Sequence, residues 1–406
     1  MFGLFQKKNS RVYLDNASAT PVDVRVLSEM QVYFNEKFYN PSALYQEGVF
    51  VRNIIEQSRN TIATELHARP QEIFFMDGAT EANNAAILGI VRLWQKNNPN
   101  TQPHIITSVI EHSSVLEVFK SLEQEGVLVT YLEVDERGLV SSKELKKELQ
   151  KNTILISIGY VNGEIGTIQN IREIMKTIRH FRKHNDNQYP YFHTDAVQAV
   201  NYVSEMNVLK LGIDCMTINA GKIYGPKKIA VFFKKMNVAI DPIMFGGNQE
   251  NGIRSGTENV PYIVGMEHSL SFARKLQPSE ILRLQKLKDF FISQLKKQFT
   301  EVIINAEGVE SIPSIVNITF PNISHEEVMI RLDARGIMCS VKSACKVGEE
   351  GDSHVIKAIA RDDRPTGSLR FSMGRTTTKK DVDRVVKELK VIVENMNSVY
   401  KKYYLT

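Results

Sequence analysis

Lys222 is the residue whose position in this sequence most strongly suggests chemistry. It lies in Asn-Ala-Gly-Lys-Ile-Tyr-Gly-Pro (219–226), after an apolar run, and Asp195 likewise ends a second apolar run. A lysine between a buried strand and a turn is expected to be partly buried, which lowers the pKa of its amine and makes it nucleophilic toward carbonyls. A lysine that binds an aldehyde and an acid that pairs with a ring nitrogen are what a pyridoxal phosphate (PLP) site requires. A buried Lys222–Asp195 ion pair is the structural alternative.

A phosphate site is predicted at Gly-Ala-Thr-Glu (78–81), between an apolar run and a segment of good helix formers. Thr80 is the expected N-cap of that helix. The N–H groups at a helix start, preceded by a small residue, suit a phosphate dianion. An ordinary cap without a ligand fits the same residues, and the segment is not a P-loop because no Gly-Lys-Ser/Thr follows.

Three further side chains are candidates for the same site. His112 follows a predicted strand and could stack on a flat ring or transfer protons near neutral pH, although a loop histidine without a role fits equally. Arg370 could bind a carboxylate through two parallel hydrogen bonds, and a surface ion pair is its alternative. Cys345 lies between Lys342 and Lys346, which favour a thiolate that can attack and carry sulfur.

Composition describes an ordinary globular chain: 406 residues, 42% hydrophobic and 24% charged, which favours two domains. The formal net charge is +5, and no arginine–aromatic stripe suggests nucleic acid as a partner. We find no secretory signal and no apolar run of 18 residues, so we expect a cytoplasmic protein without a membrane segment. The three cysteines form no disulfide framework; Cys215 and Cys339 are expected to pack in cores, and no metal site is predicted.

Short apolar runs alternate with longer amphipathic segments through the first 260 residues. This alternation predicts an α/β fold with a mostly parallel sheet covered by helices on both faces. The predicted strands are 72–76, 104–108, 128–134, 153–158, 191–194, 215–218 and 229–233. The predicted helices include 81–95, 115–125, 142–150 and 171–184.

The pattern changes near residue 260, where we place a domain boundary. Residues 20–260 are predicted to form the large PLP-binding domain, and residues 261–406 a smaller α+β domain that carries the Cys345 loop. Residues 1–19 are expected to pack with the small domain. Its predicted elements are a helical stretch interrupted near Pro278 (262–299), a strand (314–320), a helix from His325 and a final helix (379–404).

In this order, these motifs resemble the cysteine desulfurases, PLP enzymes of the class V aminotransferase family. The Ser-Ala-Cys context of Cys345 is similar to the group that serves iron–sulfur assembly and tRNA thiolation. The resemblance implies the type I fold of PLP-dependent transferases, with a seven-stranded large domain and a smaller α+β domain. The matching runs are 13–21, 40–42, 78–81, 111–112, 161–166, 193–198, 222–227, 254–259, 343–345 and 369–375.

The resemblance also implies how PLP would be held. Lys222 would bind it covalently and later move the substrate's α-proton, Asp195 would pair with the ring nitrogen, and His112 would stack on the ring. Gln198 would donate to the phenolic oxygen. The phosphate would be held by Ala79, Thr80 and, from a second subunit, Thr257. A homodimer is therefore expected, because Thr257 is useful only across an interface.

The implied reaction uses two residues of the C-terminal part. Arg370 would bind the carboxylate of L-cysteine, and Cys345 would attack its sulfur, leaving L-alanine and an enzyme persulfide. An acceptor protein, either an iron–sulfur scaffold or a tRNA-thiolation carrier, would then take the sulfur. Two alternatives remain: another PLP enzyme of this fold, such as a selenocysteine lyase or a class V aminotransferase, or a paralogue that has lost its chemistry and acts as an interaction protein.

Several positions depart from the family's pattern. Gly221 stands where a phosphate-binding histidine is usual, and Asn219 where a serine is expected. Asn219 can still donate through its amide, whereas Gly221 can donate only through its backbone N–H, so we predict altered PLP anchoring. Gly163 replaces an asparagine near the substrate carboxylate; the adjacent Asn162 is a second candidate, although an extended strand would point it elsewhere. The remaining departures are Lys342 for glycine and Tyr45 for histidine.

Overall fold

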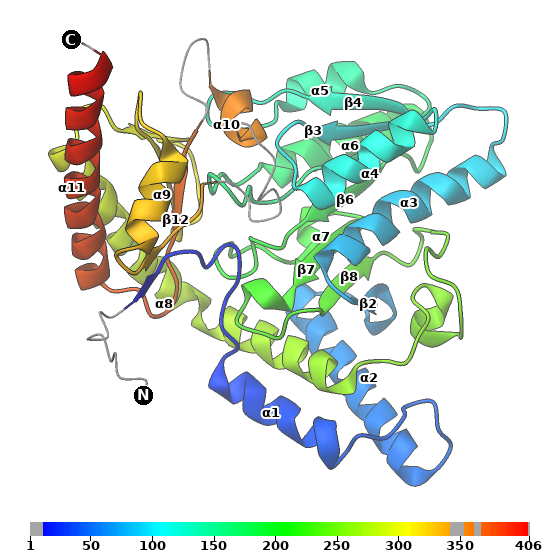
Figure 1. Cartoon of the computed structure of the whole chain (residues 1–406). Helices are drawn as coiled ribbons and strands as arrows, with labels where there is room; N and C mark the ends of the chain where they lie inside the picture. Colours follow the sequence, from blue (N-terminus) through cyan, green and yellow to red (C-terminus); the bar gives the residue numbers. More distant parts are fainter. Residues whose placement is uncertain (1–10, 342–352, 361–366, 405–406) are drawn as a thin grey trace.

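The computed structural model describes residues 11–341, 353–360 and 367–404. At its centre is a seven-stranded sheet with the order β2-β8-β7-β6-β5-β3-β4 (Figure 1). All strands run in one direction except β8, which is antiparallel to both neighbours, so the predicted mostly parallel sheet is confirmed. The strands are β2 (Ile73–Met76), β3 (His104–Ser108), β4 (Leu128–Leu132), β5 (Thr153–Ser157), β6 (Tyr191–Asp195), β7 (Cys215–Asn219) and β8 (Ala230–Lys234).

Side chains of the strands alternate between two apolar cores, one on each face of the sheet. Phe74 and Ile105 belong to one core, and their neighbours Phe75 and Ile106 belong to the other. Burial on both faces explains why the strands are apolar throughout. Helices α3 (Ala79–Asn97) and α4 (Ser113–Gln124) cover the first face. The helices that cover the second face are α2 (Gln46–Leu66), α5 (Ser142–Glu148), α6 (Ile171–His184), α7 (Val208–Leu211) and the first half of α8 (Val260–Gln298).

Helix α8 is continuous, so the predicted interruption near Pro278 is wrong. Proline removes one backbone donor and clashes with the preceding turn, which usually kinks or ends a helix. Here tertiary packing holds both halves in register. Gln277, the residue before the proline, donates from Nε2 to the carbonyls of Val200 and Val203, each at 2.9 Å. The first half packs on α2 and on α1 (Val24–Asn35), and α11 (Lys379–Tyr404) also packs against α8.

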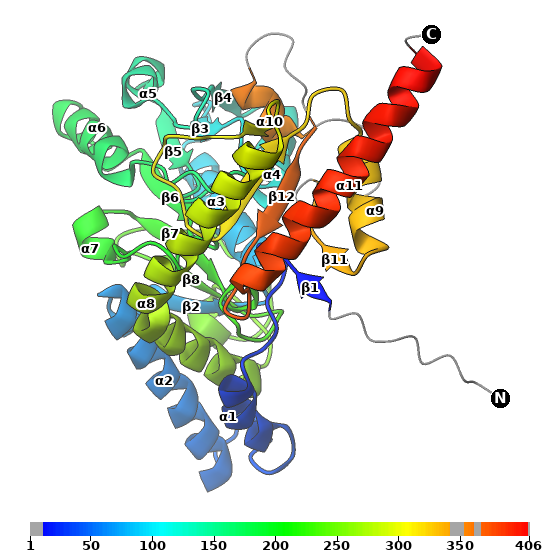
Figure 2. The same cartoon turned by 90° about the vertical axis from the view of Figure 1, so that its left-hand side faces the viewer.

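A smaller apolar core lies beside the sheet, where Figure 2 shows β1 next to β11 and α11 running past them. The N-terminal segment enters this core: β1 (Val12–Tyr13) pairs in parallel with β11 (Ile337–Met338), and Leu14 is fully buried there. The exact boundaries of the two domains stay a prediction. The other elements of this core are the second half of α8, α11, β9 (Ile303–Ile304), β10 (Ile315–Thr319), β12 (Leu369–Ser372) and α9 (His325–Asp333).

Helix α10 (His354–Ile359) follows the small core in sequence but packs elsewhere. Its residues Val355 and Ile356 are buried against Ile110 and Ile165, which belong to loops at the edge of the large sheet. One end of this short helix therefore reaches the same edge as the carboxyl ends of the parallel strands. Among the residues described, no helix is long and apolar enough to cross a membrane.

Candidate active site

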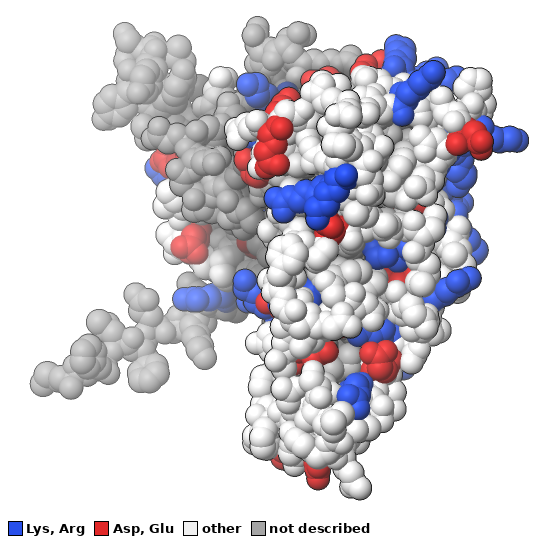
Figure 3. Space-filling view, turned by 90° about the vertical axis from the view of Figure 1, so that its right-hand side faces the viewer, with Lys and Arg blue, Asp and Glu red and all other residues white. Residues whose placement is uncertain are grey.

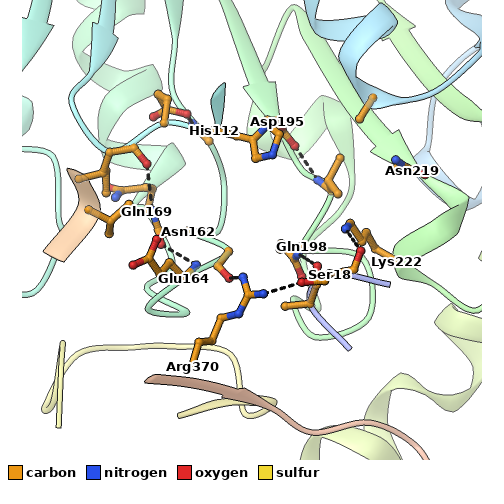
Figure 4. Close-up of a pocket in the computed structure, with 18 of the residues that line it drawn as sticks. Ser18, His112, Asn162, Glu164, Gln169, Asp195, Gln198, Asn219, Lys222 and Arg370 are labelled. Carbon is orange, nitrogen blue, oxygen red and sulfur yellow. Dashed lines mark hydrogen bonds between the residues drawn. The ribbon is translucent and has the colours of Figure 1, made fainter. Parts of the chain in front are cut away.

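A cavity of about 250 Å³ opens where the carboxyl ends of β3, β5, β6 and β7 meet (Figure 4). Parallel strands end at a common edge, so residues far apart in sequence converge there. Gly221 and Thr257 do not line this cavity, and Cys345 lies outside the described residues. The predicted site residues that line it are Ala79, Thr80, His112, Asn162, Gly163, Asp195, Gln198, Asn219, Lys222 and Arg370.

Lys222 is positioned by the short turn that follows β7 and by the N-terminal segment. Its Nζ donates to the carbonyl of Ser18. Thr20 holds the same turn, because its N–H and its hydroxyl both donate to the carbonyl of Gly221, at 3.2 and 3.1 Å. Tyr224, two residues further on, has a φ of +63° and donates its N–H to the Thr20 hydroxyl at 2.9 Å. A bulky residue in this left-handed region is a rare, strained conformation that the surrounding contacts maintain.

The carboxylate of Asp195 is held by a hydrogen bond from a buried asparagine. Asn83, which is fully buried on α3, donates from Nδ2 to Asp195 Oδ2 at 2.8 Å and to Ser114 Oγ at 2.9 Å. The N–H of Val197 donates to Asp195 Oδ1 at 3.0 Å. Asp195 and Lys222 thus have separate hydrogen-bond partners, and these two described residues do not form the simple ion pair that was the structural alternative. The contact between Asn83 and Asp195 depends on packing that no local sequence pattern reveals.

His112 is the N-cap of α4 and lies at the rim of the cavity. The backbone N–H of Ser114 donates to its Nδ1 at 3.1 Å. Nδ1 therefore acts as an acceptor, which leaves Nε2 to carry the proton of the neutral ring. The exposed imidazole is held by its own helix start, with the ring at the cavity opening. This arrangement is compatible with the predicted stacking role.

Glu111 is a cavity residue that the sequence reasoning did not single out. Its buried carboxyl accepts from Ser108 Oγ at 2.5 Å and from the Gly159 N–H at 2.9 Å. Burial raises the pKa of Glu111 to about 7, and the charge of Asp195 raises it further. The hydrogen bonds from Ser108 and Gly159 favour the charged form and oppose this rise. Glu111 also accepts through its backbone carbonyl from His354 Nε2 of α10, at 3.0 Å.

The start of α3 offers donors for an anion. The helix begins at Ala79 with Gly78 as its cap, so the prediction that Thr80 is the N-cap is wrong. The reason is conformational: Gly78 has φ +135° and ψ 170°, a region open essentially to glycine alone, which lets the helix start two residues earlier. The N–H groups of Ala79 and Thr80 consequently lie in the first turn, where no intrahelical acceptor is available. Arg254 braces the turn by pairing with Asp77 at 2.8 Å and with Glu81 at 3.2 Å.

Asn219 and Gly221, which both depart from the family's pattern, are hydrogen-bonded to each other. Asn219 Oδ1 accepts the Gly221 N–H at 2.9 Å, so that N–H is not directed into the cavity. Asn219 Nδ2 donates to no residue in the part of the chain that the structure describes, and its role toward a phosphate stays a prediction. A Cβ built on Gly221 would meet its nearest neighbour, Asn219 Oδ1, at 3.4 Å, an ordinary contact. The fold therefore does not require glycine at 221.

Arg370 enters the cavity from β12 with only 3% of the residue exposed, so the alternative of a surface ion pair is wrong. Its Nη1 donates to the Gly163 carbonyl at 3.0 Å, and its Nη2 donates to Asp15 Oδ1 at 2.9 Å and to Ser18 Oγ at 2.7 Å. A carboxylate in this place would meet a buried cation whose orientation is already fixed.

Asn162 lies beside Arg370's partner Gly163, but its side chain closes a turn. Its Oδ1 accepts the N–H groups of Glu164 and Ile165 at 2.9 and 3.0 Å, and its Nδ2 donates to the Ile110 carbonyl at 3.0 Å. Most of the amide's hydrogen-bonding capacity is therefore used by the protein itself.

These residues fit PLP by the chemistry of their donors and acceptors. The cavity combines the start of a helix for a phosphate dianion, a carboxylate for a ring nitrogen and an amine for an aldehyde. No group of three or more metal-ligating side chains occurs in the part of the chain that the structure describes.

Residues 12–385 match the family model of the class V aminotransferases. The chain belongs to this family. It is 39% identical to a cysteine desulfurase IscS of Dictyoglomus turgidum over 389 residues, which is 96% of either chain. Among solved structures, a NifS-like protein superimposes with a TM-score of 0.85 at 33% identity, covering 95% of this chain and 99% of that one. A structure described as SspA in complex with cysteine gives a TM-score of 0.73 at 31% identity and covers 89% and 98%. The predicted relationship to the cysteine desulfurases is confirmed.

In this member of the class V family, Thr257 is exposed and lies on the loop that follows Arg254. Arg254 ties that loop to the start of α3, behind the predicted phosphate site. Thr257 does not reach the cavity of its own chain. Its predicted role, which requires a second subunit, stays a prediction.

Proposed function

We propose that this protein is a PLP-dependent cysteine desulfurase, which converts L-cysteine to L-alanine and transfers the sulfur to Cys345. The observation that carries the proposal is that Lys222, Asp195 and Arg370, from three separate parts of the chain, open on one cavity. Amine, ring-pairing acid and carboxylate-binding cation are the set that an amino-acid substrate and PLP require together. The location of Cys345 outside the described residues means that its role rests on sequence.

The residues that would hold PLP are those at the strand ends. PLP, when bound, withdraws electrons from the substrate and weakens bonds at its Cα and Cβ. Asp195 would favour a protonated ring nitrogen: at about 4 Å and an effective dielectric near 20, the pairing contributes about 4 kcal/mol, or roughly three pKa units. Asn83 keeps that carboxylate aimed. The phosphate and ring would be bound by Ala79, Thr80, Asn219 Nδ2, Gln198 and His112, with Thr257 contributed by a partner subunit.

Arg370 would fix the substrate by its carboxylate, and Lys222 would move the proton at Cα. The Lys222 amine donates to the carbonyl of Ser18, whose hydroxyl accepts from Arg370, so it lies close to where the substrate would be held. The Cys345 thiolate then attacks the substrate sulfur. A sulfur–sulfur bond forms, the carbon–sulfur bond breaks, and its electron pair stays on carbon, which takes up a proton to give alanine. The persulfide retains the sulfur for an acceptor.

We infer a homodimer that acts in the cytoplasm and passes sulfur to a protein acceptor of iron–sulfur assembly or tRNA thiolation. Support for the dimer comes from an apolar surface on the lobe formed by α1 and α2. Figure 3 shows this lobe with mostly uncharged surface between scattered acidic and basic side chains. Large apolar side chains exposed on these two helices and the loop between them are Val24, Leu27, Phe34, Phe38, Leu44, Tyr45 and Phe50.

The test is a two-product assay on purified protein with added PLP, L-cysteine and a reductant. We expect alanine and sulfide in equal amounts, with both lost in Lys222→Ala. Cys345→Ala distinguishes the alternatives: it abolishes desulfuration in the proposed enzyme but leaves a class V aminotransferase active. A protein that takes up no PLP and develops no visible absorption band would instead be a non-catalytic paralogue. L-selenocysteine in place of L-cysteine tests the lyase alternative by comparison of kcat/KM.

A further inference from the structure

The guanidinium of Arg370 has five N–H donors, and three of them are engaged by the protein. Both Nη2 hydrogens are used, one by Asp15 Oδ1 and one by Ser18 Oγ. One Nη1 hydrogen is used by the carbonyl of Gly163. The buried Nε has no acceptor among the residues that the structure describes. Figure 4 shows the guanidinium directed toward Ser18.

This pattern conflicts with direct docking of a carboxylate. A carboxylate that binds arginine through two parallel hydrogen bonds uses either Nε with Nη2 or Nη1 with Nη2. Both arrangements need an Nη2 hydrogen, and both of these already have acceptors. A substrate carboxylate must therefore displace Asp15 or Ser18 from Nη2.

The structure also indicates which group moves. Arg370 exposes 3% of its side chain and needs a negative partner to remain buried, because an unpaired buried charge is strongly unfavourable. The side chain of Asp15 exposes 21%, so its carboxylate has access to water when it leaves. Asp15 also keeps one partner after displacement, since Ser18 Oγ donates to Asp15 Oδ1 at 2.8 Å. The neutral Ser18 cannot replace the charge of an aspartate.

We propose that Asp15 is a positioning residue that occupies the carboxylate site on Arg370 until the carboxylate of the amino-acid substrate displaces it. The inference rests on the proposed role of Arg370 as the carboxylate-binding residue. Asp15 keeps the arginine oriented and neutralised in the empty enzyme, and only a ligand with its own carboxylate can take its place. The exchange makes the site selective for a free carboxylate and lowers its apparent affinity.

Calorimetric titration of the PLP-loaded enzyme with L-alanine tests this, because L-alanine carries the carboxylate without the reactive sulfur. In Asp15→Asn, the competing charge is gone and Arg370 is left without a counter-ion, so we expect L-alanine to bind about tenfold more tightly. L-alaninamide, which lacks the carboxylate, should bind equally to both proteins. For L-cysteine turnover, KM should fall with kcat unchanged, a split that a general structural defect would not produce.

Asp23→Asn is the matched control, because it removes an acid from Arg375 at 3.0 Å in a pair that does not line the cavity. It should leave L-alanine affinity unchanged. Unchanged or weaker binding of L-alanine to Asp15→Asn overturns the inference about Asp15. The proposed function stands in that case if Arg370→Ala loses the preference for L-alanine over L-alaninamide. If Arg370→Ala keeps that preference, the role of Arg370 fails and the inference fails with it. Should Asp15→Asn not fold, Asp15→Ser takes its place, because it also removes the competing charge from Arg370. The same tightening of L-alanine binding is expected, and no tightening overturns the proposal.

Discussion

Glu111→Gln is expected to stabilise the folded protein relative to the natural one, by an amount that grows as the pH rises. The pKa of Glu111 is raised from 4.5 to about 7 in the folded protein, mainly by burial. Between these values the folded state binds more protons than the unfolded state, so stability falls as the pH increases. Each pKa unit corresponds to about 1.4 kcal/mol, which gives a full penalty of about 3 kcal/mol above pH 7. Glutamine has no such penalty, because it does not ionise.

The amide of glutamine can also keep the local hydrogen bonds. Its oxygen can accept from the Gly159 N–H, and its NH₂ can donate to Ser108 once that hydroxyl rotates to act as an acceptor. Urea unfolding of the PLP-free protein at pH 5, 6, 7 and 8 measures the effect at one protein concentration. The free energy of unfolding of the variant should gain about 2 to 3 kcal/mol over that of the natural protein between pH 5 and pH 8.

An exposed glutamate on the neighbouring helix provides the control. Glu117→Gln removes an acid whose side chain is 58% exposed and pairs with Lys120 on the helix surface, so its stability curve should run parallel to that of the natural protein. A Glu111→Gln curve that is also parallel would refute the reasoning, because it would mean that the buried carboxyl already ionises at an ordinary pKa. A uniform loss at every pH would instead mean that the amide does not preserve the two hydrogen bonds.

The other predictions concern PLP affinity, measured by titrating PLP into the PLP-free protein and following its absorbance. Asn83→Ala removes the donor to Asp195 and should weaken PLP binding at least tenfold, since a lost hydrogen bond to a charged group costs about 1.5–3 kcal/mol; unchanged affinity would exclude Asn83 as the group that aims Asp195. Gly221→His should tighten PLP binding, because the site has room for a Cβ and the imidazole adds a phosphate donor; an unaltered affinity contradicts altered anchoring by glycine. Gly78→Ala should lower both the free energy of unfolding and the affinity for PLP, because alanine at φ +135° adds about 1–3 kcal/mol of strain even though its Cβ would face open space. Equal melting temperatures for the variant and the natural protein would argue against that strain.

The sheet was predictable from the sequence because its strands are short apolar runs bounded by turn residues. The sequence predicts strand β3 with its observed bounds, and it places Asp195 and Lys222 at strand ends because each follows an apolar run. Both line one cavity because parallel strands end at a common edge. Thr80 was misplaced as a cap because the choice between two capping residues depended on the backbone of Gly78, which no side-chain pattern encodes. Pro278 was misjudged because packing on distant carbonyls outweighs its local preference.

The contacts between residues far apart in sequence were beyond prediction. Nothing in the local sequence links Asn83 to Asp195, or Asp15 to Arg370, because both pairs are created by the way the elements stack. In the sequence, Glu111 stands out only as the neighbour of His112 in the matching run 111–112. Its burial beneath the strand ends, which gives it a pKa near neutrality, is a property of the assembled site.

The edge of the cavity is formed by two segments that lie far apart in the sequence, 17–18 and 370–372. Ala17 donates its N–H to Ser372 Oγ at 2.9 Å, while its neighbour Ser18 accepts from Lys222 and Arg370. During synthesis from the amino terminus, this opening stretch has to wait for more than 350 later residues before its final neighbours exist. A nascent chain can complete most of its central sheet and still be unable to hold an amino acid. The site for an amino acid is therefore assembled only after residue 372 has been synthesised.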